Sequence, residues 1–200
     1  TDPIDRSMLA KVDAVIAEST LGFDAFDYAR GLERTESFFW WFCDNYVELV
    51  KNRAYEAMGP DAAASARRAL REALSSLQRL LAPFLPFATE EAWSWWHDTS
   101  IHAADWPTAS ELGGDAARVD PTIDALTLVR RAKSEAKVSQ RAEVSSVEIT
   151  APASAHAALE AGVLRDLLDR CDQRGGHDLG AGGVVAGEGL DQGVDPNGPG

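Results

Sequence analysis

Two closely spaced prolines, Pro83 and Pro86, constrain the fold of this chain more than any other sequence feature. Proline disfavours helical angles in the residue before it, so a helix arriving from upstream should end near Ala82. Proline is tolerated in the first turn of a helix, so Pro86 can begin a new one. Glu90 and Glu91 would then lie near the positive N-terminal end of that second helix. The segment therefore predicts a corner between two helices.

Apolar residues recur at helical spacing in most of the chain before this corner and again after residue 120. The second of the predicted helices has its widest apolar stripe around Phe38 to Phe42, which places that stretch at the centre of a helical bundle. Trp106 should fill the edge of the bundle, with stacking on an RNA base as the alternative. The predicted helices run from residue 2 to about 21, from about 24 to 55, from 61 to about 82, from 86 to about 96 and from 121 to 137.

Two motifs connect these helices with a known family. Phe38 to Tyr55 reads F-F-W-W-F-C-D-N-Y-V-E-L-V-K-N-R-A-Y, and Leu80 to Trp93 reads L-L-A-P-F-L-P-F-A-T-E-E-A-W. Both resemble the anticodon-binding helical domain of class I aminoacyl-tRNA synthetases, specifically the valyl-tRNA synthetases. The family patterns are F-W-x-F-C-D-x-Y-x-E-L-x-K-x-R and L-x-P-x-x-P-F-x-T-E-E-x-W. Isoleucyl- and leucyl-tRNA synthetases share looser versions of both, so an isoleucine enzyme is an alternative, although the carboxy-terminal zinc cluster that would favour it is not seen.

Composition and the resemblance together predict how the chain is organised. We expect a mainly α fold, with an anticodon-binding helical bundle that lacks its first helix, followed by a small and incomplete α+β appendage. Ten of the sixteen glycines lie between Gly175 and Gly200, which predicts a flexible coil there. The expected boundaries are the bundle at 1–110, a linker at 111–121, the appendage at 122–174 with its strand near 144–149, and the Gly-rich tail at 175–200.

The resemblance also implies what this chain does not do alone. The catalytic domain of the family carries H-I-G-H and K-M-S-K-S signatures, and neither occurs in this sequence. We therefore expect a fragment without aminoacylation activity, with ATP and Mg²⁺ used in the catalytic domain of the parent enzyme and no cofactor here. Cys43 and Cys171 lack the C-x-x-C spacing of a zinc site, so no metal is expected.

The resemblance implies that the bundle reads an anticodon loop, which makes valine tRNA the expected partner. Arg6 is the first candidate for contacting bases, because the family's D-R motif lies near the anticodon side. Lys51 and Arg53 are the next candidates, with an ion pair to Glu48 or Glu56 as the structural alternative. The remaining candidates share one predicted helix, and they either contact phosphates or form a solvated face: Arg130, Arg131, Lys133 and Lys137.

The net charge of −13 by itself argues against RNA binding, because phosphate contacts require Lys and Arg. RNA responds to the local field, however, so a basic patch on an acidic protein can still bind it. A helical protein-interaction module that has lost RNA binding is the alternative, and the acidic charge and the Gly-rich ending support it. Without a visible signal peptide or a bilayer-length apolar run, a cytoplasmic monomer with no membrane contact is expected.

Overall fold

The structure is a computed structural model that describes residues 2–55, 59–110 and 112–139. This described part is helical and contains no strand, so the predicted mainly α fold is confirmed. The predicted strand near 144–149 and the tail at 175–200 lie outside the described residues.

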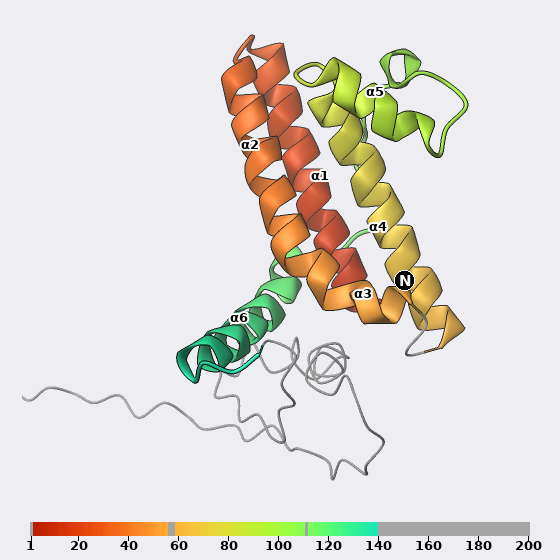
Figure 1. The fold of residues 1–200 in the computed structure, drawn as a ribbon. Coiled ribbons are helices and arrows are strands. Elements are labelled where there is room, and N and C mark those ends of the chain that lie inside the picture. Colours follow the sequence, from red (N-terminus) through yellow and green to blue (C-terminus); the bar gives the residue numbers. More distant parts are fainter. Residues whose placement is uncertain (1, 56–58, 111, 140–200) are drawn as a thin grey trace, which may run out of the picture.

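The helices form a bundle with a short crossing helix at one end (Figure 1). The long helices α1, α2 and α4 run side by side, α5 lies across the upper end of α4, and α6 extends from the lower end. The bounds are α1 Pro3–Asp24, α2 Tyr28–Trp41, α3 Glu48–Ala54, α4 Pro60–Leu81, α5 Pro86–Ser94 and α6 Asp120–Glu135, with a π-helical segment η1 at Phe42–Val47 and 3₁₀ turns η2 at Ile101–Ala103 and η3 at Ala116–Val119.

The first helix begins as predicted and ends later than predicted. The Asp2 carboxylate caps it by accepting a 2.8 Å hydrogen bond from the Ile4 N–H, and Pro3 occupies the first turn. Gly22 was expected to break the helix, but α1 continues to Asp24. A Cβ at Gly22 would lie 3.1 Å from the Asp27 carbonyl oxygen. The glycine therefore serves the close approach of α2 to α1 rather than the end of the helix.

The proline corner is confirmed. Helix α4 ends at Leu81 with Ala82 as its C-cap, and α5 begins at Pro86. The Glu90 carboxylate accepts hydrogen bonds of 2.9 Å from the Ser100 hydroxyl and 2.9 Å from the Ile101 N–H, which fixes the loop after α5. The chain after α5 is thus tied back onto α5 itself.

The predicted long second helix is present as α2, η1 and α3 in unbroken succession, with a π-helical turn at its centre. The apolar stripe on this helix packs against α1 and α4, and π segments of this kind locally widen the helix. The core of the bundle consists of Ile4, Met8, Leu9, Val12, Ile16, Phe38, Phe42, Tyr46, Leu49, Val50, Ala66, Ala69, Ala73, Leu77 and Leu80 together with Val119, Ile123, Ala125 and Leu126.

The region expected to be a linker packs closely on α1. The Ser7 hydroxyl accepts a 2.9 Å hydrogen bond from the buried Val119 N–H, and Lys11 Nζ lies 2.9 Å from the Asp120 carboxylate. A Cβ on Gly114 would lie 2.4 Å from the Arg6 carbonyl oxygen, so only glycine fits that contact. The beginning of α6 therefore shares the core of the bundle, through Val119 at its N-cap and through Ile123 and Leu126.

Trp106 lies at the edge of the bundle, as predicted. Its indole Nε1 donates a 2.9 Å hydrogen bond to the Thr20 hydroxyl, and its ring centroid lies 4.8 Å from that of Phe23. This contact joins the loop after α5 to α1. Within the described residues, no helix has the length and apolar character needed to cross a membrane.

Candidate RNA interface

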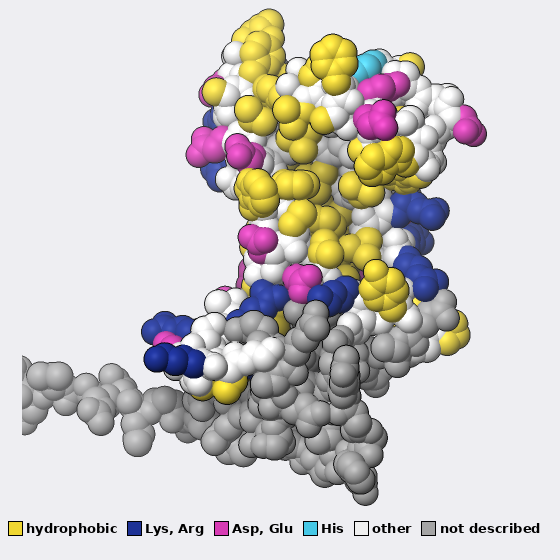
Figure 2. Space-filling model, in the orientation of Figure 1, with side chains coloured by type: hydrophobic (Ala, Val, Ile, Leu, Met, Phe, Trp, Pro, Cys, Tyr) yellow, Lys and Arg dark blue, Asp and Glu magenta, His cyan; other side chains and the backbone are white. Residues whose placement is uncertain are grey.

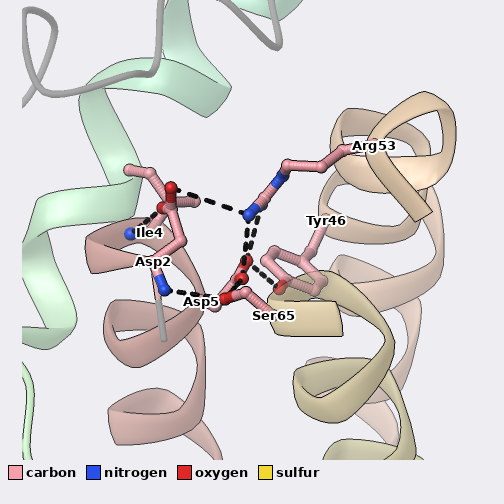
Figure 3. A network of polar contacts seen from close by, with 6 residues as sticks. All are labelled: Asp2, Ile4, Asp5, Tyr46, Arg53 and Ser65. Carbon is pink, nitrogen blue, oxygen red and sulfur yellow. Dashed lines mark hydrogen bonds and ion pairs between the residues drawn. The ribbon is translucent and has the colours of Figure 1, made fainter. Parts of the chain in front are cut away.

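A buried ion pair holds the start of α1 against α3 and α4 (Figure 3). The Asp5 carboxylate has no exposed surface and is contacted by both terminal nitrogens of Arg53, with Nη1–Oδ2 and Nη2–Oδ1 distances of 2.8 and 2.6 Å. The Tyr46 hydroxyl donates to the same carboxylate at 2.6 Å, and the Ser65 hydroxyl donates as well. The Asp2 carboxylate approaches Arg53 at 3.7 Å. A bidentate pair whose carboxylate also accepts two hydroxyl hydrogen bonds is the arrangement that makes a buried charge tolerable.

This network gives Arg53 a structural role. Its side chain is 3% exposed, so the bundle encloses the guanidinium group that the sequence analysis selected as a candidate RNA contact. It pairs with Asp5 from the first helix, 48 residues away in the sequence, a partner that the sequence did not suggest, and Glu56 lies outside the described residues. We therefore correct the sequence-based assignment and remove Arg53 from the candidate contacts.

Lys51 remains at the surface. Its ammonium group forms a 3.0 Å ion pair with the Glu48 carboxylate one turn earlier on α3, which is the structural alternative that the sequence offered. Both side chains are partly exposed, so the pair is screened by water and can open to receive a phosphate. The position of Lys51 is therefore compatible both with a structural ion pair to Glu48 and with a contact to RNA.

The basic residues of α6 and of the turn that follows it occupy four different environments. Arg130 donates a 3.0 Å hydrogen bond from Nη1 to the Asp44 carbonyl oxygen in the π-helical turn, and Arg131 pairs with Glu135 at 2.7 Å on an exposed face. Lys133 is only 7% exposed, which sets it apart from the solvated face that the sequence predicts. Lys137 is exposed and adopts a positive φ of 55° at the residue that terminates the helix. Only part of this set can therefore meet RNA directly.

Arg6 lies on the exposed side of the first turns of α1. Its side chain makes no hydrogen bond or ion pair within the part of the chain that the structure describes. It is one residue from the buried Asp5, so its backbone is fixed while its guanidinium is free to reach solvent. This combination suits a residue that recognises an RNA group.

The structure brings the remaining candidates to one end of the bundle. The Asp5–Arg53 pair joins the start of α1 to α3, and Arg130 joins α6 to η1 at the same end. In Figure 2, dark blue side chains gather where α6 meets the lower end of the bundle. We call this the basic end and define it by Arg6, Lys51, Arg130, Arg131 and Lys137.

The opposite end carries exposed aromatic residues that sequence reasoning did not select. Phe26, in the turn between α1 and α2, is 80% exposed, and Phe87, in the first turn of α5, is 89% exposed. We call this the aromatic end, and define it by Phe26, Tyr28 and Phe87. The P-F-x-T-E-E-x-W motif contains this aromatic residue and could have drawn attention to it. Thr89 and Trp93 of the motif are buried, whereas the Phe87 side chain is exposed. Exposed aromatic rings are the groups on which unpaired RNA bases stack.

The described residues contain no group of three or more His, Cys, Asp or Glu side chains placed to hold a metal ion. Cys43 is partly buried within η1, and burial, with the nearby charge of Asp44 as a smaller cause, raises the pKa of its thiol. Thiolate chemistry at neutral pH is therefore disfavoured there.

Comparison with known proteins gives a consistent result. The family model described as the anticodon-binding domain of tRNA ligase matches residues 5–149. A valine–tRNA ligase from Thermobifida fusca is 53% identical over 154 residues, which cover 74% of this chain and 17% of that protein. The valine–tRNA ligase from Cutibacterium acnes is 51% identical over 165 residues, which cover 80% of this chain and 19% of that protein. The one from Salinispora arenicola is 48% identical over 195 residues, which cover 84% of this chain and 23% of that protein. The chain spans about a fifth of the length of these relatives.

Proposed function

Because the chain belongs to the family of anticodon-binding domains of tRNA ligases, we propose that it is the anticodon-binding part of a valine–tRNA ligase. The observation that carries this proposal is the high identity to valine–tRNA ligases across most of the chain. In this role the chain binds the anticodon loop of valine tRNA. Activation of valine with ATP and Mg²⁺ would take place in a catalytic domain whose signatures this sequence does not contain.

The basic end supplies the groups that such a role requires. Arg131 and Lys137 are exposed cations, Lys51 pairs with the partly exposed carboxylate of Glu48, and Arg130 donates to a carbonyl of the π-helical turn. These side chains would hold phosphates and so position the loop. Arg6 would read a base edge, because an exposed guanidinium on a fixed backbone can offer a bidentate hydrogen bond.

The proposal is tested by binding of labelled anticodon stem-loops to the whole 200-residue chain. Three loops are compared by fluorescence anisotropy at fixed salt: one with a valine anticodon, one with an isoleucine anticodon and one with a scrambled loop. We expect the valine loop to bind most tightly, and Arg6→Ala to reduce this preference. Arg34→Ala is the matched control, because Arg34 pairs with Glu18 on α2 and α1, outside the basic end.

The outcomes separate the alternatives. A preference for the isoleucine loop would assign the chain to the isoleucine enzyme. Equal affinity for all three loops would leave a helical interaction module that has lost specific RNA binding. A valine preference that survives Arg6→Ala but is lost in Phe26→Ala or Phe87→Ala would move base recognition from the basic end to the aromatic end.

A further inference from the structure

A cleft of about 400 Å³ lies between α1, α4 and the segment that follows α5, on a different part of the bundle from the basic end. Val12 of α1 contributes apolar surface, and α4 contributes Arg71, Ser75 and Arg79. Trp96 and His97, just after α5, contribute an indole and an imidazole. The volume lies within the range of pockets that hold small organic ligands.

The carboxylates that line this cleft already have other partners. Asp13 accepts hydrogen bonds from the Ser110 N–H at 2.7 Å and from the Ser110 hydroxyl at 3.1 Å. Glu72 pairs with Arg68 at 2.9 Å, and Arg68 does not line the cleft. Neither carboxylate therefore neutralises a cation of the cleft.

The two arginines of the cleft lack a salt bridge within the described residues. Arg71 is exposed and its side chain has no hydrogen bond or ion pair there. Arg79 donates from Nε to the Ser75 carbonyl at 3.1 Å and from Nη1 to the Asp105 carbonyl at 3.2 Å, which orients its guanidinium without neutralising it. Burial lowers the pKa of Arg79, and the charge of Asp105 offsets this only as the smaller cause. An anion bound beside either guanidinium would compensate its charge.

Two ring nitrogens of the cleft residues also lack partners. Trp96 Nε1 and His97 Nε2 are buried and make no hydrogen bond within the described part of the chain. An indole N–H can only donate, so the Trp96 nitrogen requires an acceptor. An acceptor atom on a ligand bound in the cleft would satisfy the Trp96 N–H.

We propose that this cleft binds an elongated phosphate ester: either a free nucleotide or one nucleotide unit of an RNA strand. Arg71 and Arg79 are eight residues apart on α4, which corresponds to about 12 Å along a helix axis. That separation is too long for one small carboxylate and suits a ligand with a phosphate at one end and a polar group at the other. One guanidinium fork would hold the phosphate oxygens, the other would bind the polar group at the far end of the ligand, and the aromatic side would face the base or sugar.

The experiment follows the Trp96 indole N–H in ¹H–¹⁵N spectra of the full chain, with Trp96→Phe to assign the signal. The probes are uridine monophosphate, a short oligouridylate and inorganic phosphate, each at matched ionic strength. We expect the signal to shift saturably with the nucleotide or the oligonucleotide. Arg71→Gln and Arg79→Gln should each weaken binding about tenfold, the loss expected for one charged hydrogen bond. Arg34→Gln is the matched control, because neither Arg34 nor its partner Glu18 lines the cleft, and it should change binding less than twofold.

Each result decides a point. Saturation by the mononucleotide supports a free-nucleotide site, and saturation by the oligonucleotide alone supports an RNA-strand site. Equal binding of inorganic phosphate overturns the elongated ligand, and a shift that ignores both arginine substitutions overturns the site. Circular dichroism confirms folding, and Arg79→Lys keeps the charge if Arg79→Gln unfolds. Arg6 lies outside the cleft, so Arg6→Ala can abolish the anticodon preference without changing nucleotide binding in the cleft. The proposed function and the proposed cleft site can therefore fail separately.

Discussion

Asp5 is a buried carboxylate whose two oxygens accept hydrogen bonds from three side chains. Its tolerance of burial depends on those donors, because a carboxylate removed from water without them would be strongly unfavourable. The same contacts connect three helices, α1 through Asp5, α3 through Arg53 and α4 through Ser65. One residue thus fixes the geometry on which the basic end is built.

Removal of Asp5 should be more damaging than removal of the whole pair. We expect Asp5→Ala to lower the free energy of unfolding by about 3–5 kcal/mol, because it leaves Arg53 buried without its counter-charge. The double variant Asp5→Leu/Arg53→Met should lose less than Asp5→Ala alone. Urea denaturation of the variants measures both values. A double variant that is less stable than the single one would mean that the pair contributes through more than mutual neutralisation.

Phe26 carries backbone strain at the aromatic end. It adopts a positive φ of 57°, where the Asp27 N–H donates a 2.8 Å hydrogen bond back to the Gly22 carbonyl and closes helix α1. Glycine occupies this region without the steric cost that an L side chain has there.

We expect Phe26→Gly to raise the free energy of unfolding by about 1 kcal/mol, measured by urea denaturation, since the exposed ring buries little surface. The comparison variant is Phe87→Gly, which places glycine in the first turn of α5 and should be neutral or destabilising. Destabilisation by both would show that Phe26 contributes packing that outweighs its strain.

At the scale of helices, the sequence predicts those helix boundaries that depend on residues close together in the chain. The end of α4, the start of α5 at Pro86 and the Asp2 cap were all predictable, because each depends on residues close in sequence. The Asp5–Arg53 pair joins positions 48 residues apart, and no periodicity reveals such a partner. The packing of Gly114 on Arg6 was likewise invisible, because a polar, Gly-containing stretch reads as a linker until its neighbour is known. Arg53 was therefore assigned to RNA, and its burial emerged only from the fold.

The predicted core can be tested on two helices at once. Phe42 in η1 and Trp93 in α5 are buried in separate apolar clusters, so Phe42→Ala and Trp93→Ala should each destabilise the fold by about 3–5 kcal/mol. Trp95→Ala, two residues from Trp93 but exposed, should stay within about 0.5 kcal/mol of the unmodified chain. Thermal and urea unfolding supply the values. A small loss for Trp93→Ala would mean that the second cluster folds independently of the first.

At the scale of the whole molecule, function should divide between this chain and the rest of the proposed enzyme. The purified 200-residue chain should show no valine-dependent exchange between ATP and pyrophosphate, since it contains neither class I signature. The radioactive exchange assay measures this, with a complete valine–tRNA ligase as the positive control. Robust exchange by the pure chain would contradict the proposed division of labour.

The net charge of the chain predicts weak RNA binding, whereas the local charge of the basic end predicts binding. The dependence of RNA affinity on salt concentration distinguishes these two predictions. The chain carries a net charge of −13, yet exposed cations meet at the basic end. If they contact phosphates, the logarithm of affinity should fall with the logarithm of salt concentration by about 0.7 per contact on a single strand. Arg130→Glu/Arg131→Glu should then flatten the slope by about 1.4, if each arginine makes one contact, and weaken all anticodon loops alike.

The matched control for this measurement is Arg30→Glu/Arg34→Glu, which makes the same change in charge on α2, away from the basic end. Both double variants carry an equally acidic total charge, so a general repulsion of RNA would weaken them to the same degree. A local phosphate site would instead flatten the slope only in the α6 variant. Equal slopes in the two variants would remove the basic end as the phosphate-binding surface, whereas a selective change would show that the fold concentrates its few exposed cations where an acidic protein can still hold RNA.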